Sequence, residues 1–303
     1  MHTFGLDPEF MLVSRGQLKS AIGVLPKKIK AKHFEGNYFY YDNVLAEIAV
    51  KPAYSKENTI YNVEKALKGL VKIIHPIKFD LCAADNYPKK ELNSFDARLA
   101  GCNPEWNVYT LQCILPPKDI ISETSFRTAG GHIHLGSKSL QEPDMVFKAV
   151  RMLDLFVGIP SILLDRDPTS KKRRKIYGQA GSHRITKYGL EYRCLGNFWL
   201  SSPEHVGFIY DLCCFILEFI EGSGYNKFWY TNELLLEKEN PSEAYACYGY
   251  DVAALIKCIN CCDIVVAKKF MNFLSHYLPK CLLIRFEELM ERKKTDPYCS
   301  WHL

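Results

Sequence analysis

The chain has 303 residues, of which 48% are hydrophobic and 24% charged, and its formal net charge at pH 7 is +5. This length is enough to bury a full core, and the composition excludes a disordered chain. The small net charge excludes a protein that binds nucleic acid through general electrostatics.

The first 50 residues predict strands and turns. Apolar residues alternate with polar ones from Phe4 to Leu12, and an aromatic run occupies residues 38–41, a pattern typical of half-buried strands. Apolar residues then recur at helical spacing over 57–74, and the His75-Pro76 step ends that helix. We expect this helix to lie on the surface of a sheet.

A further strand is predicted at 77–83, and it leads into a segment rich in Asn, Asp, Pro and Gly, residues 85–110. Such a composition is typical of a long functional loop. The next elements expected are a strand at 131–136 and an amphipathic helix at about 143–164.

The last third of the chain begins with a strand predicted at 190–199 and a helix that starts at Pro203 behind a serine cap. The longest apolar stretch, 208–220, is interrupted by charged residues and is shorter than the ~20 residues of a transmembrane helix. The N-terminal residues also lack the features of a secretory signal. We therefore expect a cytoplasmic protein with no membrane partner.

Twelve cysteines are distributed through the chain, mostly inside apolar helical stretches, where a reduced thiol packs as a small hydrophobe. A zinc site built on Cys258, Cys261 and Cys262 would need further ligands at a paired spacing. Only Cys247 and Cys281 lie near, without that spacing. We therefore expect buried, reduced thiols.

The strands alternate polar with apolar residues, which favours an antiparallel sheet with one wet face over a fully buried parallel sheet. No strand leads into G-x-G-x-x-G, and G-x-x-x-x-G-K-[ST] is absent from the chain. Any nucleotide must therefore be held in another way. We predict an α+β fold in a single domain, residues 1–303, which is mainly helical from about residue 240.

Functional side chains recur two residues apart on three predicted strands. Side chains at i and i+2 share one face of a strand, so each pair implies a common surface. The pairs are Asp7 with Glu9, His132 with His134, and Glu191 with Arg193. In a fourth segment, Glu47 lies opposite the apolar face, although Leu45 weakens this assignment. One pair alone is typical of a solvated surface, but their co-occurrence favours one site.

Carboxylates gathered on one face repel one another unless cations compensate them. Oxygen ligands with one or two imidazoles suit Mg²⁺ or Mn²⁺, and we expect more than one ion. Such ions usually bridge to phosphates, which also need Arg and Lys. The basic run 171–175 precedes a glycine-punctuated loop and could clamp a triphosphate, although such a run alone is typical of a solvated loop.

Five short motifs occur in order over about residues 1–200. They are Gly5-x-Asp7-Pro8-Glu9-Phe10, Gly101-Cys102-Asn103-Pro104-Glu105-Trp106-Asn107, Gly130-Gly131-His132-Ile133-His134-Leu135-Gly136, Arg174-x-x-Tyr177-Gly178-x-x-Gly181-x-x-Arg184 and Gly189-x-Glu191-Tyr192-Arg193. Together they resemble the phage-type COOH-NH2 ligase (amidoligase type 2) family, whose fold is similar to those of glutamine synthetase and glutamate-cysteine ligase. The resemblance implies a curved, mainly antiparallel sheet with one catalytic face and with helices on the other.

The resemblance also implies roles for individual residues. The metal ligands would be Asp7, Glu9, Glu47, His132, His134 and Glu191, with Asp7 either a ligand or a partner of one. The phosphates of ATP and the acyl-phosphate would be held by Arg173, Arg174, Lys175, Arg184, Arg193 and His132. The catalytic residues would be Glu9, Glu191, Arg184 and Arg193.

The predicted activity is ATP-dependent ligation of a carboxylate to an amine through an acyl-phosphate, with Mg²⁺ or Mn²⁺ as the ion. The substrates would be small molecules or peptides, and the compartment would be the host cytoplasm if a phage encodes the chain. Neither the two substrates nor the oligomeric state follows from the sequence. Two alternatives remain open: a metal-dependent hydrolase or phosphotransferase that uses the same His and carboxylate cluster, and a nucleic-acid-binding protein that uses the run 171–175.

Overall fold

The computed structural model describes all residues except 1, 100–103, 116–117, 223–250 and 294–295. Its central feature is an antiparallel sheet whose strands follow the order β3-β4-β5-β1-β11-β13-β12-β8-β9, with β2 and β6 also paired to β1. These strands are β1 (Thr3–Ser14), β2 (Gln17–Lys19), β3 (Lys32–Phe34), β4 (Asn37–Asp42), β5 (Leu45–Ala53), β6 (Lys78–Asp80), β8 (Glu105–Asn107), β9 (Cys113–Ile114), β11 (Gly131–Gly136), β12 (Ser182–Thr186) and β13 (Gly189–Tyr192). A separate pair consists of β7 (Ala84–Asn86) and β10 (Phe126–Thr128).

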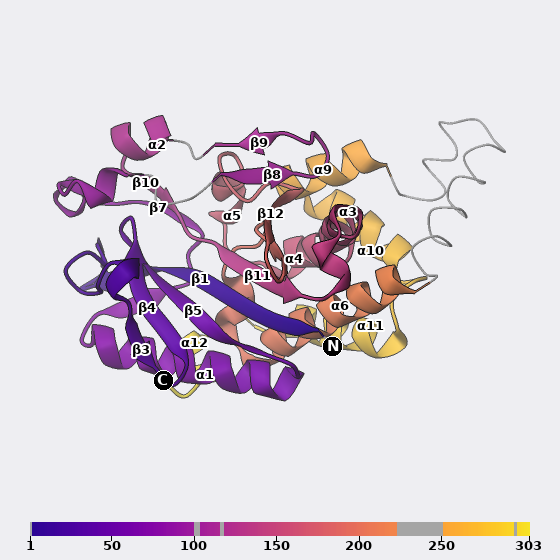
Figure 1. Ribbon diagram of the computed structural model, residues 1–303, viewed down its shortest axis with the longest axis horizontal. Helices are drawn as coiled ribbons and strands as arrows, with labels where there is room; N and C mark the ends of the chain where they lie inside the picture. Colours follow the sequence, from indigo (N-terminus) through magenta and orange to yellow (C-terminus); the bar gives the residue numbers. More distant parts are fainter. Residues whose placement is uncertain (1, 100–103, 116–117, 223–250, 294–295) are drawn as a thin grey trace.

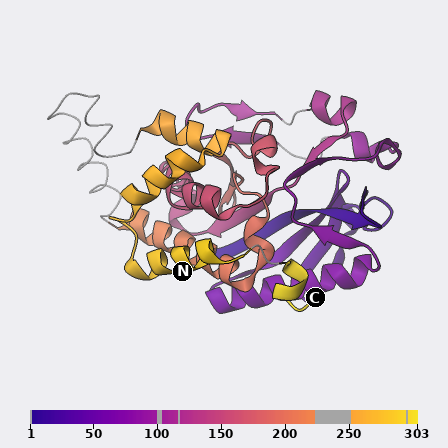
Figure 2. The same ribbon diagram turned by 180° about the vertical axis from the view of Figure 1, so that it is seen from behind.

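Helices cover the sheet and form most of the C-terminal part of the described chain. They are α1 (Lys56–Ile74), α2 (Lys118–Glu123), α3 (Pro143–Leu153), α4 (Ile159–Leu164), α5 (Ser170–Arg173), α6 (Pro203–Glu221), α9 (Val252–Cys261), α10 (Ile264–Leu274), α11 (Lys280–Glu291) and α12 (Pro297–Ser300). Figure 1 shows α1 beneath the strands β3, β4 and β5. Seen from behind in Figure 2, the orange and yellow helices α9, α10 and α11 occupy the half of the molecule away from these strands.

Several predicted elements are confirmed closely. The helix expected at 57–74 is α1, capped by Ser55, whose hydroxyl accepts from the amide of Asn58. The helix expected at Pro203 is α6, capped by the hydroxyl of Ser202. The strand expected at 131–136 is β11. The mixed α and β architecture and the antiparallel sheet are also as predicted.

The amphipathic helix expected over 143–164 is not continuous. A π-helical turn, Asp154–Gly158, separates α3 from α4. Pro160 lies in the first turn of α4, and because proline has no amide hydrogen it cannot donate to the carbonyl of Phe156 in a regular α-helix. The apolar spacing continues through the turn, which is why the sequence pattern does not reveal the break.

Two predicted strands are shorter than expected. The strand expected at 190–199 pairs in the sheet only over β13, because the chain then turns at Gly196 and Asn197 into a 3-10 helix, Phe198–Ser201. The strand expected at 77–83 ends after β6, where the Asp80 carboxylate accepts from the amide of Cys82 and the chain turns away.

One face of the sheet packs against helices in the main hydrophobic core, which includes Phe4, Leu6 and Leu190. The opposite face, predicted to be wet, is only partly so. A second apolar cluster covers part of it, formed by Met11, Val44, Leu45, Tyr87, Leu92, Ala97 and Ala129. Residues 85–99, expected to be part of a long loop, therefore supply this cover through Tyr87, Leu92 and Ala97. Leu45 belongs to the same cluster, which explains an apolar residue on the face that carries Glu47.

Within the described residues, no helix is both long and apolar enough to cross a bilayer.

Of the cysteines considered for zinc, Cys258 is buried and its thiol donates to the carbonyl of Asp263. Cys247 and the motif residues Gly101, Cys102 and Asn103 lie outside the described residues, as does the part of the C-terminal prediction that covers 240–250.

Candidate active site

Cross-strand register brings the predicted functional side chains into two adjoining rows. In the first row, Arg184 of β12 lies opposite Glu191 of β13, which lies opposite His134 of β11. His132 of the same strand lies opposite Asp7 of β1. Directly opposed residues on one face have side chains close enough to interact, so sequence positions far apart form one surface.

The second row runs from β1 to β4. Glu9 of β1 lies opposite Glu47 of β5, which lies opposite Tyr40 of β4. The Tyr40 hydroxyl donates to Glu47 Oε1 over 2.7 Å, and the amide of Gly130 donates to Glu9 Oε2 over 2.7 Å. These two contacts fix the carboxylates in place.

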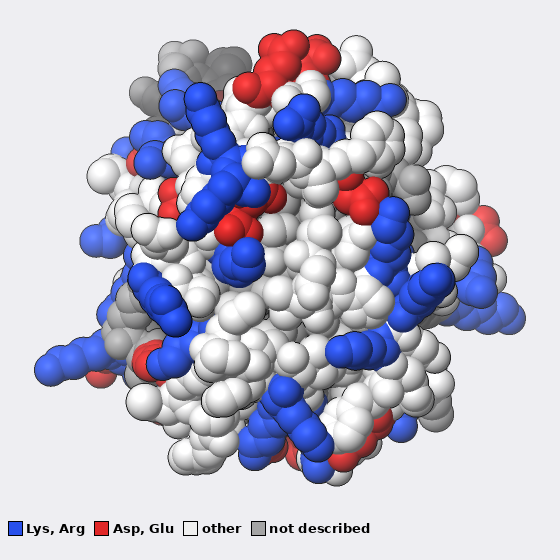
Figure 3. All heavy atoms as spheres, turned by 90° about the vertical axis from the view of Figure 1, so that its left-hand side faces the viewer, with Lys and Arg blue, Asp and Glu red and all other residues white. Residues whose placement is uncertain are grey.

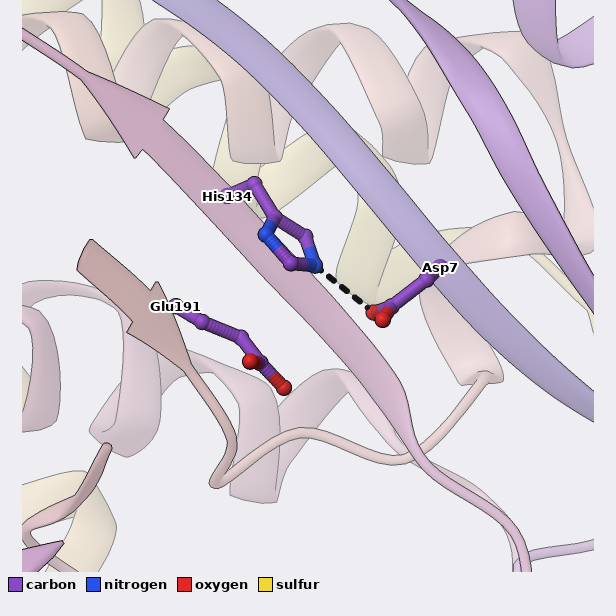
Figure 4. Close-up of side chains that lie close together, drawn as sticks. All are labelled: Asp7, His134 and Glu191. Carbon is purple, nitrogen blue, oxygen red and sulfur yellow. Dashed lines mark ion pairs between the residues drawn. The ribbon is translucent and has the colours of Figure 1, made fainter. Parts of the chain in front are cut away.

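Asp7, His134 and Glu191 form a first candidate metal centre, which we call the histidine group. One potential ligand atom from each residue lies within 4.8 Å of the others. His134 Nε2 lies 2.9 Å from Asp7 Oδ1, and Figure 4 shows the imidazole and the two carboxylates directed toward one another from three neighbouring strands. This donor set of one imidazole and two carboxylates suits Mg²⁺ or Mn²⁺.

Two atoms of the histidine group are buried without a hydrogen-bond partner. They are Asp7 Oδ1 and His134 Nε2, which form a close ion pair but do not have hydrogen-bond geometry. Buried polar atoms normally have a partner. Their convergence at one point therefore fits a bound cation better than a finished hydrogen-bond network.

Glu9, Asp42 and Glu47 form a second candidate centre, the carboxylate group. Their oxygens also lie within 4.8 Å of one another, and Glu9 and Glu47 are each only 5% exposed. Three carboxylates this close and this buried cannot all stay ionised unless a cation compensates them. An all-oxygen set of this kind is typical of a magnesium or manganese site.

Most acids of the two groups have a raised pKa, because burial disfavours the charged form. Burial, with the nearby charge of Asp42, raises the pKa of Glu9 to about 8, and burial with Asp7 raises the pKa of Glu191 to about 7. Burial also raises the pKa of Glu47 and of Asp42. A divalent cation would reverse this trend by favouring the ionised form of each ligand.

The pKa values of the two histidines shift in opposite directions. Burial and the neighbouring Arg193 lower the pKa of His132 to about 3, so its imidazole is neutral at pH 7. Its Nδ1 lies 3.3 Å from Asp7 Oδ1 and 3.6 Å from Glu191 Oε1. Burial lowers the pKa of His134, but the ion pair with Asp7 outweighs this effect and raises it overall. His132 therefore lies against the histidine group, and the nitrogen of His134 is the closer of the two to Asp7 Oδ1.

Arg193 lies beneath the histidine group and is only 1% exposed. Its Nε donates to Glu105 Oε2 over 2.7 Å, and its Nη1 donates to Glu191 Oε1. The guanidinium also lies over the ring of Tyr177. With two carboxylates already bound, Arg193 is placed to hold Glu191 in position, and this placement does not support the predicted contact with phosphate.

Arg184 is the more accessible arginine of the site, with 21% of its side chain exposed. Its Nη1 lies 3.3 Å from Glu191 Oε1, and its Nε donates to the carbonyl of Pro104. The predicted role of Arg184 at phosphate is therefore compatible with its position at the edge of the histidine group.

Two side chains of the basic run 171–175 do not take part in the predicted clamp. Arg173 and Arg174 are almost completely buried, because α5 is a single turn that directs successive side chains in different directions. Arg173 donates to the carbonyls of Cys194 and Arg193, and Arg174 donates to the carbonyl of Ile259 and to Ser161 Oγ. Both arginines thus bind backbone in the core, and only Lys171, Lys172 and Lys175 are exposed.

Gly178 of the same loop lies against Arg173. Its φ is +67°, and a Cβ at this position would lie 2.0 Å from Arg173 Nη1. A side chain larger than hydrogen is excluded here by both the backbone conformation and the guanidinium. This glycine of the basic loop therefore accommodates a buried arginine.

Three residues of the site were not predicted from the sequence. Asp42 completes the carboxylate group, Tyr40 binds Glu47, and Glu105 binds Arg193. Tyr40 and Asp42 are two residues apart on β4, so the same alternation that identified the other pairs could have identified them. Glu105 lies in a quoted motif, but nothing in the sequence indicates its partner.

A family model described as phage phiEco32-like COOH.NH2 ligase-type 2 matches residues 124–227. This range contains His132, His134, Arg184, Glu191 and Arg193, whereas the acids of β1, β4 and β5 precede it. The chain is thus similar to these ligases over the part that contains β11, β12 and β13.

Among solved structures, a bifunctional glutathione synthetase from Pasteurella multocida matches with a TM-score of 0.38 and 12% identity. The match covers 95% of this chain and 51% of that chain, so this chain spans about half of the length of that protein. At this score the likeness supports no inference of its own. No curated protein matches the chain.

Proposed function

We propose that the protein is an ATP-dependent carboxylate-amine ligase that uses Mg²⁺ or Mn²⁺. The observation that carries this proposal is the convergence of the histidine group and the carboxylate group on one face of an antiparallel sheet. The family match over residues 124–227 supports the ligase class, since it covers the strands that supply His134 and Glu191. A glutamine-synthetase-like arrangement of the sheet and a cytoplasmic location belong to the same proposal.

Residues of the two groups would hold the divalent ions. Asp7, His134 and Glu191 would bind one ion, and Glu9, Asp42 and Glu47 a second. Bound ions would supply charge neutralisation for the transferring phosphoryl group. The neutral imidazole of His132 lies against the first group and can accept a hydrogen bond or support a ligand there.

The proposed reaction has two steps. A carboxylate oxygen of one substrate attacks the γ-phosphorus of ATP, the bond to the β,γ-bridging oxygen breaks, and ADP leaves. The nitrogen of a neutral amine then attacks the acyl carbon, phosphate leaves, and the proton lost from the amine passes to a base or to solvent. The chain's part is to place both substrates and to offset negative charge, and Arg184 is positioned to do so at the edge of the first group.

The direct test is ADP release by the purified chain in Mg-ATP with mixtures of carboxylates and amines. We expect ADP only when both substrate classes are present, together with a condensed product whose mass is the sum of the two substrates minus water. Glu191→Gln, which keeps the size of the side chain but removes its charge, should abolish this turnover without unfolding the protein.

A metal-dependent hydrolase or phosphotransferase could use the same donors. Turnover that proceeds without nucleotide would support a hydrolase and contradict the ligase. Phosphate transfer to an acceptor with no amide product would support a phosphotransferase.

Nucleic-acid binding through the run 171–175 loses most of its basis, because two of its five side chains are buried in the core. In addition, lysines and arginines are scattered among acidic side chains on the face shown in Figure 3, so this face carries no continuous basic patch.

A further inference from the structure

A triphosphate bound at the two acidic groups would need positive side chains, and the two arginines of the run 171–175 do not supply them there. Arg173 and Arg174 bind backbone carbonyls in the core, and Arg193 is held by two carboxylates. Arg184 borders the histidine group from β12. The carboxylate group includes Asp42 of β4, several strands away from β12, although Arg184 and Arg193 also favour the ionised form of Asp42. A phosphate bound on this side would need an accessible cationic neighbour.

Lys28 is that neighbour. Its Nζ lies 3.8 Å from Glu47 Oε1 and 4.8 Å from the centroid of the Tyr40 ring. Burial raises the pKa of Glu47 and of Asp42, and the positive charge of Lys28 opposes this rise because it favours the ionised form of each acid. Lys28 therefore already contacts two members of the second row, although no sequence motif identifies it.

The backbone around Lys28 is anchored, while its side chain is not. The carbonyl of Pro26 accepts from the amide of Tyr41, and Lys27 Nζ lies 2.9 Å from Asp96 Oδ2. Lys28 itself begins a short 3-10 helix, Lys28–Lys30, and 73% of its side chain is exposed. Because the backbone of Lys28 is fixed and its side chain is exposed and flexible, the ammonium can move by a few ångströms at little cost in free energy.

The contact with Glu47 is suited to the protein without a bound cation. A divalent ion bound to Glu9, Asp42 and Glu47 would neutralise the negative charge that attracts the Lys28 ammonium. The ion and the ammonium, both positive, would then repel each other. A phosphate held by that ion would present new negative oxygens at the same place. The ammonium of Lys28 would then move from the carboxylate to the phosphate.

We propose that Lys28 is a phosphate-binding residue of the site and contacts the triphosphate from the side of β4, while Arg184 contacts it from the side of β12. This inference rests on the proposed function, because it requires Mg-ATP to bind at the two acidic groups. It assigns the positive charge that the phosphates need to two accessible side chains at opposite ends of the cluster.

The test compares the affinity of wild type, Lys28→Met and Lys30→Met for Mg-ATP and for adenosine, by calorimetry. Lys30 lies in the same 3-10 helix and is exposed, so its variant controls for the loss of one positive charge from the surface. We expect Lys28→Met to bind Mg-ATP about tenfold more weakly, as for the loss of one charge-assisted hydrogen bond. Adenosine binding should not change, and Lys30→Met should behave as wild type.

Mn²⁺ binding in the absence of nucleotide gives a second readout. Lys28→Met should bind Mn²⁺ at least as tightly as wild type, since a competing positive charge has been removed. Loss of Mn²⁺ affinity in this variant would show that Lys28 supports the carboxylates and does not serve the phosphate. Unchanged Mg-ATP affinity in Lys28→Met would overturn the inference and leave the proposed function intact. A wild-type chain that does not bind Mg-ATP would overturn both.

Discussion

Arg193 lies between two buried carboxylates, those of Glu105 and Glu191. Its removal would leave both acids without their partner in a site that excludes water. We expect Arg193→Ala to lower the free energy of unfolding by roughly 3–5 kcal/mol, as for a broken buried ion pair. Urea unfolding measures this loss.

Arg184→Ala is the matched control for Arg193→Ala, because Arg184 also contacts Glu191 but is partly exposed. We expect it to change the unfolding free energy by less than about 1 kcal/mol and to weaken the binding of Mg-ATP. Equal destabilisation by the two variants would contradict the supporting role of Arg193.

Asp154 is fully buried at the start of the π-helical turn and accepts a hydrogen bond of 2.7 Å from the hydroxyl of Tyr192. Burial raises its pKa to about 7, above the unfolded value of about 3.9. The folded protein therefore holds this proton more tightly, and the stability that Asp154 contributes is lost as the pH rises from about 4 to about 7. Asp154→Asn, which cannot ionise, should make the decline of stability with pH shallower.

Urea unfolding at about pH 5 and about pH 8 checks this prediction. The free energy of unfolding of Asp154→Asn minus that of wild type should be larger at about pH 8 than at about pH 5. Asp144→Asn is the control, because the side chain of Asp144 is 75% exposed, and its pH dependence should match that of wild type. The same dependence in wild type and Asp154→Asn would show that Asp154 ionises freely in the fold.

At the scale of elements, a glycine of β1 and a glycine of the neighbouring strand β11 differ in the space around them. A Cβ on Gly131 would lie 2.5 Å from the carbonyl oxygen of Gly196, whereas a Cβ on Gly5 would lie 3.5 Å from its nearest neighbours. We expect Gly131→Ala to destabilise the protein by roughly 1–3 kcal/mol through overpacking. Gly5→Ala should cost less than about 1 kcal/mol, since a Cβ at this position would make ordinary van der Waals contacts and no clash. Thermal unfolding compares the two, and equal effects would contradict the close approach at Gly131.

The strand alternation was sufficient to predict which side chains share a face. Asp7, Glu9, His132, His134 and Glu191 all lie on the face opposite the main core, because a strand leaves its side chains only two directions. The extent of the elements was harder to predict. The π-helical turn and the early end of β13 depend on Pro160 and on a turn at Gly196, which interrupt apolar patterns that otherwise continue.

At the scale of the whole molecule, the site depends on contacts between distant segments that a sequence pattern does not encode. Asp7 and Glu191 meet through the register of β1, β11 and β13. Arg173 and Arg174 resemble surface residues in the sequence, but the folding of 193–194 and 259 around them supplies carbonyl partners that bury them. A run of basic residues in the sequence indicates charge but not the direction of each side chain, which explains why Arg173 and Arg174 were wrongly assigned to the clamp.

The central claim is that the two acidic groups bind divalent cations together with ATP, and Mn²⁺ titration followed by electron paramagnetic resonance tests it most directly. The account predicts more than one Mn²⁺ bound per wild-type chain with ATP, with one site lost in Glu191→Gln and a different one lost in Glu47→Gln. Mn²⁺ binding that is absent from wild type, or unaltered in both variants, would contradict it.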